Sequence, residues 1–240
     1  MGFVEGYPTN SFFIYEFDGF IKDEADLADY KTKMKGGVPT NLRVGDAKYV
    51  DKDGDGVLEP TLYKEGDPNS GDIVYKGTNN QRYLYGINLG LDWKGIDVSA
   101  FLQGVGKWDC INGTYAGGGE VWKQSSQYFY HNTWSPDRPN AEYPRLTQDG
   151  GIHGYNYQWS DAPYKFFNNR YLRLKEVQIG YTFPTTLTKK IGVEKLRVYA
   201  TGMNLLEWDN LPNGFDPEAP YTENLIPFSR TYSIGVNVQF

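Results

Sequence analysis

Apolar and polar residues alternate along three parts of this chain of 240 residues. In the first part the apolar positions are Tyr83, Tyr85, Ile87, Leu89 and Leu91, then Ile96, Val98, Ala100 and Leu102 after the dipeptide Lys94-Gly95. The residues between them are mostly small or polar. A period of two is typical of strands, which place successive side chains on opposite faces. The range 82–107 is therefore predicted to be a β-hairpin.

A second hairpin is predicted over 170–206, with arms at 170–183 and 195–206. Its connection, residues 184–194, has a sequence that suits one helical turn. The first arm alternates cleanly only through Val177, Ile179, Tyr181 and Phe183. Residues 172–175 break the phase, which indicates either a bulge or a part of the strand that rises above a membrane.

The last eleven residues alternate most clearly, with one apolar row formed by Tyr232, Ile234, Val236, Val238 and Phe240. A strand of a soluble sandwich has the same alternation, but it would leave the terminal Phe240 ring uncovered. In a membrane barrel the last strand closes on the first and its outer face meets lipid. We therefore interpret 230–240 as a closing strand whose apolar row acts as a barrel-assembly signal.

Long and short connections alternate between these segments, as in outer-membrane barrels with extended external loops and short periplasmic turns. The expected fold class is all-β, the C-terminal strands of a large antiparallel transmembrane β-barrel with long extracellular loops. Phe240 is then periplasmic. The predicted division is 1–81 mostly extracellular loop with a possible strand at 11–21, 82–107 hairpin, 108–169 extracellular loop, 170–206 hairpin, 207–229 extracellular loop and 230–240 closing strand.

Five or six strands do not close a barrel, for which eight is the practical minimum. We expect the missing strands to precede Met1 or to come from other chains. The first ten residues also lack the basic segment and apolar stretch of a secretory signal. The chain is thus expected to be truncated at its start.

Composition supports a barrel with a wet lumen. Aromatic residues make up 16% of the chain, hydrophobic residues only 39%, and the mean hydropathy is -0.60. No apolar run approaches the ~20 residues of a membrane-spanning helix, so strands would have to cross the membrane. The formal net charge of -6 argues against a nucleic-acid partner, which requires clustered basic residues.

Seven segments, in this order and spacing, resemble the SusC/RagA-type TonB-linked outer-membrane transporters of Bacteroidetes over nearly the whole chain. They are Glu-Gly-Tyr-Pro at 5–8 with Ser-Phe-Phe-Ile-Tyr-Glu-Phe-Asp-Gly at 11–19, then 45–56, 85–104, 171–184, 196–205, 214–218 and 230–240. The resemblance implies a 22-stranded barrel with an N-terminal plug and a SusD-type surface lipoprotein as partner. It also implies import of oligosaccharides or peptides with energy supplied through TonB. The plug and the TonB-contacting segment would lie upstream of this chain.

The segment 51–59 matches the first half of a calcium loop. Asp51, Asp53 and Asp55 stand at positions 1, 3 and 5, Gly56 at position 6, and Leu62 occupies position 12, where a bidentate Glu would close the shell. The predicted ligands of Ca²⁺ are therefore Asp51, Asp53, Asp55, the carbonyl of Val57, and Glu59. Glu59, Glu65 or Asp67 would have to take the place of the bidentate Glu that is missing at position 12. The competing interpretation is a solvated acidic turn, because clustered carboxylates repel one another unless a cation or solvent screens them.

The loop 108–159 is rich in aromatic residues, which offer flat faces for sugar rings or peptide side chains or else pack among themselves. The candidates for substrate contact are Trp108, Trp122, Trp134, Tyr157 and Trp159. His131 and His153 lack the spacing of a metal pair, and no carboxylate pair is placed for glycoside hydrolysis. We therefore expect no catalytic site.

Three arginines, Arg173, Arg197 and Arg230, lie on or beside predicted strands. A charge that faces lipid near the bilayer midplane costs ~2–4 kcal/mol, so these side chains are expected in the lumen or near a membrane boundary. Arg197 fits a luminal row with Tyr199 and Thr201, and a salt bridge inside the wall is its expected role.

The leading hypothesis is a segment of a transporter barrel whose loops contribute to the extracellular vestibule and the lipoprotein interface. The alternative is a secreted calcium-dependent carbohydrate-binding module, which the acidic loop and the aromatic residues also suit. A glycan-cleaving enzyme has the least support in the sequence.

Overall fold

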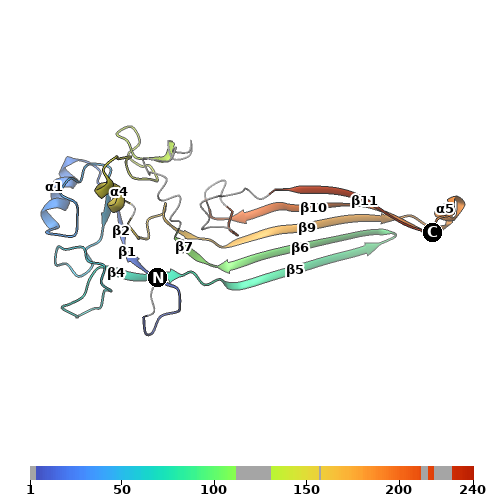
Figure 1. Ribbon diagram of the computed structural model, residues 1–240, viewed down its shortest axis with the longest axis horizontal. Coiled ribbons are helices and arrows are strands. Elements are labelled where there is room, and N and C mark those ends of the chain that lie inside the picture. Colours follow the sequence, from blue (N-terminus) through green and yellow to red (C-terminus); the bar gives the residue numbers. More distant parts are fainter. Residues whose placement is uncertain (1–3, 112–130, 157, 212–215, 219–228) are drawn as a thin grey trace. The chain divides into compact units, whose positions relative to one another are not determined.

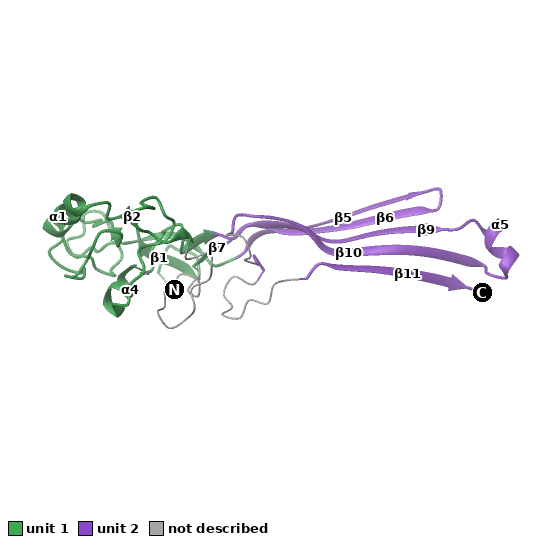
Figure 2. Cartoon of the chain, turned by 90° about the horizontal axis from the view of Figure 1, so that it is seen from above, with its two compact units in different colours: residues 1–80, 109–167, 221–223 green, residues 81–108, 168–220, 224–240 purple. Residues whose placement is uncertain are grey.

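The structure is a computed structural model that describes residues 4–111, 131–156, 158–211, 216–218 and 229–240. The chain divides into two compact units (Figure 2). Unit 1 comprises residues 1–80, 109–167 and 221–223, and unit 2 comprises residues 81–108, 168–220 and 224–240. All three two-stranded sheets in the described residues pair strands that are distant in sequence, so long-range pairing builds much of unit 1.

Unit 2 is a single antiparallel sheet of long strands in the order β11-β10-β9-β6-β5 (Figure 1). The strands are β5 (Arg82–Trp93), β6 (Ile96–Lys107), β9 (Tyr171–Thr182), β10 (Lys195–Asp209) and β11 (Thr231–Gln239). The sheet is open within the described residues, and the predicted all-β fold class is confirmed. β10 continues three residues beyond the predicted end at Leu206, because residues 206–209 pair with residues 171–174 of β9.

Local sequence explains the two short connections of this sheet. Lys94 and Gly95 both have positive φ, +49° and +88°, as a two-residue hairpin turn requires. Helix α5 (Thr185–Thr188) and the 3₁₀ turn η1 (Lys189–Ile191) fill the connection between β9 and β10. Gly192, with φ of +74°, ends η1 in the left-handed conformation.

One face of the five-stranded sheet is apolar and exposed. The register places Leu91 opposite Val98, Val98 opposite Ile179, and Ala200 opposite both Ile179 and Ile234. Because residues that face one another across strands share a face, the apolar rows of all five strands lie on the same side. Leu89 is 57% exposed and Ile234 is 84% exposed. This apolar face is therefore not covered by a second layer of described residues.

A bulge interrupts the pairing at the part of β9 where the sequence loses its phase. Glu176 pairs with Phe101 and Leu174 pairs with Leu102, so Lys175 is an extra residue on the β9 side. Of the two interpretations of residues 172–175, the bulge is the one observed. It restores Leu172 and Leu174 to the apolar face despite the break in alternation.

The opposite face carries polar side chains that bond to one another. The Arg197 guanidinium forms an ion pair with Asp97 and donates to Gln178 Oε1 at 2.8 Å. Gln178 donates to Thr201 Oγ1 at 3.1 Å, and Arg197 lies 4.9 Å from the Tyr199 ring centroid. The row predicted for Arg197, Tyr199 and Thr201 and its expected salt bridge are thus both present.

Unit 1 contains short strands, helices and loops. β1 (Ser11–Tyr15) pairs with β4 (Ile73–Thr78), β2 (Phe17–Phe20) with β3 (Ala47–Tyr49), and β7 (Asp109–Ile111) with β8 (Phe166–Asn168). The segment 11–21 therefore forms two short strands outside the five-stranded sheet. Helix α1 (Glu24–Lys33) begins at Asp23, whose carboxylate accepts the Asp26 N–H, and α4 (Gly150–Asn156) contributes the buried Ile152 and Tyr155.

The core of unit 1 is strongly aromatic. Its largest cluster of buried residues combines β1, α1, β3 and α4, with members Tyr15, Ile21, Leu27, Tyr30, Met34, Leu42, Ala47, Tyr49, Leu58, Ile152 and Tyr155. The phenols remain hydrogen-bonded, because Tyr30 and Tyr155 share a bond of 3.0 Å and Tyr49 donates to the Tyr155 carbonyl at 2.7 Å. In the part of the chain that the structure describes, no helix is long and apolar enough to cross a membrane.

Candidate functional site

The acidic loop that follows β3 is folded by its own carboxylates. Asp51 accepts the N–H groups of Gly54 and Gly56, each at 2.8 Å, through its two oxygens. Gly54 and Gly56 have φ of +82° and +89°, a region that favours glycine because it lacks a Cβ. The Asp-Gly-Asp-Gly sequence thus provides both the acceptors and the turns of this loop.

A carboxylate from a distant part of the chain, that of Asp72, also contacts this loop. Asp72 is fully buried and accepts the N–H groups of Lys52 at 2.6 Å and Glu59 at 2.8 Å. Carboxylate oxygens of Asp51, Asp53 and Asp72 lie within 4.8 Å of one another. Burial raises the pKa of Asp72, and the charges of Asp53 and Asp51 raise it further. A cation bound to these oxygens would relieve that repulsion.

The predicted metal ligands fall into two groups. Asp51 and Asp53 belong to the acidic cluster, whereas Asp55 is exposed and accepts the Val57 N–H at 2.6 Å. Glu59 contributes its backbone N–H to Asp72. The sequence prediction missed Asp72, because it lies 19 residues after Asp53 and outside the calcium-loop pattern. Only the fold identifies it.

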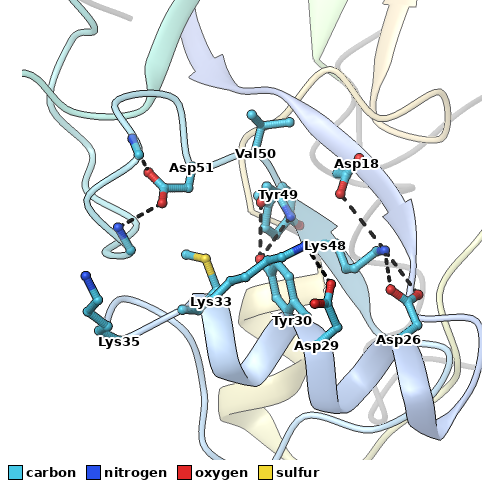
Figure 3. Close-up of a pocket in the computed structure, with 13 residues that line it drawn as sticks. Asp18, Asp26, Asp29, Tyr30, Lys33, Lys35, Lys48, Tyr49, Val50 and Asp51 are labelled. Carbon is cyan, nitrogen blue, oxygen red and sulfur yellow. Dashed lines mark hydrogen bonds and ion pairs between the residues drawn. The ribbon is translucent and has the colours of Figure 1, made fainter.

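A cavity of about 480 Å³ adjoins the loop, between α1 and β3 (Figure 3). Its charged side chains neutralise one another. Lys48 lies 2.8 Å from Asp26, Lys33 lies 2.6 Å from Asp29, and Lys35 donates to the carbonyl of Asp55 at 2.9 Å. The residues that line the cavity include no serine, cysteine or histidine. The cavity therefore contains polar contacts but none of the usual nucleophiles of acyl transfer.

An ion-pair network joins the acidic loop to β1, β4 and the segment before β8. Glu16 lies 2.5 Å from Lys52 and 2.7 Å from Lys76, and Lys76 lies 3.0 Å from Asp161. Hydrogen bonds from the two lysines lower the pKa of Glu16. Because Lys52 also donates its N–H to Asp72, the network holds the loop from two directions.

Asp46 is the buried centre of a second network in unit 1. Its side chain is fully buried, lies 2.7 Å from Arg145 Nε, and accepts a hydrogen bond of 3.0 Å from Asn156. Asn156 in turn accepts the Ala47 N–H at 3.0 Å. Residues about 100 positions apart are thereby joined through charged and amide groups.

The aromatic candidates for substrate contact differ in accessibility. Trp108 is 6% exposed and packs with Val105 and Tyr171, whereas Trp159 is 50% exposed. The Trp134 ring lies against Gly45, where a Cβ would approach the ring within 2.2 Å. Trp122 and Tyr157 lie outside the described residues. Trp159 is therefore the half-exposed ring among the described candidates.

Arg173 of β9 is a buried arginine that pairs with carboxylates in unit 2. It is 1% exposed and forms ion pairs with Glu207, with Asp216 at 2.7 Å and with Glu218 at 2.7 Å. Tyr171 also donates to Glu218 at 3.0 Å. Asp216 and Glu218 thus provide carboxylates to a buried arginine, a role that is structural.

Two buried ionisable groups in unit 1 stand apart from these networks. Lys165 is 4% exposed, and burial lowers its pKa to about 8. Burial raises the pKa of the Cys110 thiol to about 12, which suppresses the reactive thiolate at neutral pH.

The amino-acid sequence of this chain is similar to those of TonB-dependent receptors. The chain is 28% identical over 253 residues to TonB-dependent receptor P3 of Formosa agariphila, which covers 98% of this chain and 22% of that protein. It is also 28% identical over 216 residues to TonB-dependent receptor P26 of the same organism, covering 82% of this chain and 20% of that protein. The predicted resemblance to SusC/RagA-type TonB-linked transporters is confirmed.

A solved structure of the RagAB peptide transporter superposes with a TM-score of 0.62 at 25% identity. The superposition covers 98% of this chain and 23% of that chain. The chain thus spans about a fifth of the length of the curated relatives it matches. No protein-family model matches it.

Proposed function

We propose that this chain forms the C-terminal part of the barrel wall, and part of the extracellular loops, of an outer-membrane TonB-dependent importer. The observation that carries the proposal is the apolar, exposed face of the five-stranded sheet, which lies opposite a face of ion-paired polar groups. Rows of such length exposed to water are rare in soluble monomers. Hydrocarbon on one side and a wet lumen on the other satisfy both faces.

The same rows argue against a secreted carbohydrate-binding module. Such a module would expose Leu89, Leu91 and Ile234 to water, and burial of an aliphatic side chain is worth about 1.5–3 kcal/mol. In a barrel the row Tyr232, Ile234, Val236, Val238 and Phe240 meets lipid and serves as the assembly signal. The closing strand then places Phe240 on the periplasmic side.

The proposed cargo is an oligosaccharide or a peptide, captured together with a SusD-type surface lipoprotein. The TonB contact would come from the N-terminal part of the full-length protein. The likeness to TonB-dependent receptors over 98% of this chain supports the energy source, and the likeness to the RagAB peptide transporter supports a peptide. No covalent step is part of this role.

We also propose that Asp51, Asp53 and Asp72 bind Ca²⁺ in unit 1. Three carboxylates whose oxygens lie within 4.8 Å of one another, one of them fully buried, favour a hard divalent cation with oxygen ligands. The bound ion would hold the acidic loop against the segment at Asp72. Its role is to stabilise a loop that the importer presents to the outside.

Uptake measurements in the native bacterium test the proposal. Deletion of the full-length gene is expected to abolish growth on one class of oligosaccharide or peptide, and deletion of tonB is expected to have the same effect. Complementation with the intact gene restores growth. Recovery of the full-length protein from the culture medium as a monomer that needs no detergent would contradict membrane residence and favour the secreted module.

A further inference from the structure

The apolar face of the five-stranded sheet contains a hollow of about 260 Å³ at the end where β6 finishes and β9 begins. Tyr85, Leu172 and Trp208 supply apolar walls, and Arg170 and Asp209 are its charged members. All of these residues belong to unit 2. The hollow is thus a feature of the sheet itself.

Strand register places the Tyr85, Leu172 and Trp208 walls of the hollow on the apolar face, whereas Val105, Tyr171 and Asp209, which also line it, pair in the opposite row. Tyr85 lies opposite Gly104, Gly104 opposite Leu172, and Leu172 opposite Trp208. These four residues form one row across four strands, and Tyr85 shares its face with Ile87 and Leu89 by alternation. The hollow therefore continues the surface proposed to face lipid.

Two glycines of β6 lie at or beside the hollow. At Gly104 a Cβ would approach the Tyr85 ring within 2.6 Å, so the ring lies directly over the glycine. The Tyr85 hydroxyl donates to the Tyr171 carbonyl at 3.1 Å, which fixes the ring in place. Gly106 also lines the hollow and adds no side chain to fill it. The fixed Tyr85 ring and the backbone of Gly106 thus both form part of the hollow.

Arg170 is a free cation at this position. It is exposed, and within the described part of the chain its guanidinium has no hydrogen bond or ion pair. Arg173, three residues later, pairs with three carboxylates. Asp209 already accepts the Leu211 N–H at 2.7 Å. An uncompensated guanidinium beside apolar walls suits an anion attached to an apolar tail.

We propose that this hollow binds a phosphate-bearing membrane lipid, with the phosphate at Arg170 and the adjoining acyl chain against Leu172 and Trp208. The inference rests on the proposed function, because it requires this face to lie in a membrane. Tyr and Trp gather at the headgroup level of membrane proteins, and the planar guanidinium matches two phosphate oxygens. A free phosphate ion would use Arg170 but not the apolar walls.

Lipid retention by the full-length protein tests this site. The protein is purified in detergent, stripped of lipid and mixed with phosphatidylglycerol, and bound lipids are counted by native mass spectrometry. We expect Arg170→Ala and Trp208→Ala each to weaken the tightest site at least fivefold, and Arg170→Lys to retain part of the binding. Arg230→Ala is the matched control, since Arg230 is an exposed arginine next to β11 and outside the hollow.

Three results would overturn the assignment. They are undiminished binding by Arg170→Ala, an equal loss with Arg230→Ala, and equal binding of diglucosyl diacylglycerol, which has no phosphate. Inorganic phosphate that binds as tightly as phosphatidylglycerol would indicate a site for the free ion instead. Each variant is compared only after it shows the heat-dependent gel mobility of the folded wild-type protein.

A separate measurement keeps failure of this site distinct from failure of the proposed function. Leu89→Trp and Ser99→Trp variants are placed in bilayers with brominated acyl chains, which quench nearby indoles. Extra quenching of Leu89→Trp together with unchanged lipid binding by Arg170→Ala rejects the lipid site but keeps the barrel. Absence of that extra quenching rejects the membrane-facing sheet, and the lipid site with it.

Discussion

Isoleucine side chains are mostly buried in unit 1 and exposed in the sheet of unit 2. Ile14 and Ile21 of unit 1 are completely buried, whereas Ile179 and Ile234 of unit 2 are 54% and 84% exposed. Unit 1 builds its own interior from aromatic and aliphatic residues, as a water-soluble domain does. The apolar rows of unit 2 stay exposed, so that they can contact another apolar phase. The difference indicates that the two units fold against different solvents.

Charged groups show the same contrast. Unit 1 buries Asp46 and Asp72 inside networks that join distant segments. Within the sheet of unit 2, Arg197 and Asp97 lie on the face opposite the apolar rows. Buried carboxylates therefore join distant segments in unit 1, whereas Arg197 and Asp97 distinguish one face of the sheet from the other.

The largest expected effect is in the buried network of unit 1. Asp46→Ala leaves Arg145 without its partner, and removal of one member of a buried ion pair costs about 3–5 kcal/mol. Hydrogen exchange of residues 41–50 and 143–156 in the full-length protein should accelerate strongly. Asp29→Ala, which removes a partner from the exposed pair with Lys33, is the control. Equal acceleration in both variants would show that Asp46 has no special role.

The next effect tests the apolar face of unit 2. Leu89→Arg places a charge toward lipid and should destabilise the inserted barrel by about 2–4 kcal/mol. Asn88→Arg, on the neighbouring residue and the opposite face, should be tolerated. The folded fraction of each full-length variant in outer membranes provides the measurement. If both variants fold equally well, the two faces do not meet different solvents.

Calcium provides a third and smaller effect, in unit 1. Millimolar Ca²⁺ should slow hydrogen exchange of residues 50–60 and 70–74 in the wild type, by about 1–3 kcal/mol when the ion is in ~10- to 100-fold excess over its Kd. Asp72→Asn should abolish this response, and Asp29→Asn, at an exposed carboxylate outside the cluster, should keep it. Because the pKa of Asp72 is raised, protonation competes with the ion, so the apparent affinity should weaken as the pH falls. A response that survives in Asp72→Asn would place the ion elsewhere.

The smallest effect concerns Glu16, which is partly exposed. Glu16→Gln should destabilise the contact between the acidic loop and β1 by about 1 kcal/mol. The pKa of Glu16 is lower in the folded state, so its contribution is present at neutral pH and is lost as the pH falls through the acid range. The difference between wild type and variant, measured by hydrogen exchange, should shrink on acidification. A difference that grows would reverse the assigned sign.

Much of unit 2 was predictable from the sequence. Apolar and polar residues alternate with a period of two in a strand whose two faces meet different solvents. Tyr85 to Leu91 and Tyr232 to Phe240 show that period without interruption, and both lie in long strands. The bulge at Lys175 was visible as a break in the phase of β9, although its exact position required the register.

Unit 1 was far less predictable from the sequence. The calcium-loop pattern predicted Asp51 and Asp53 as ligands, whereas only the fold brings Asp72 close to them. In the same way, nothing local pairs Asp46 with Arg145 or β1 with β4, and nothing local gives Arg173 its carboxylate partner Asp216. The sequence by itself determined which strand faces are apolar, because alternation is a property of neighbouring residues. Tertiary structure decided which charges meet, because those contacts join residues whose separation in the sequence carries no periodic signal.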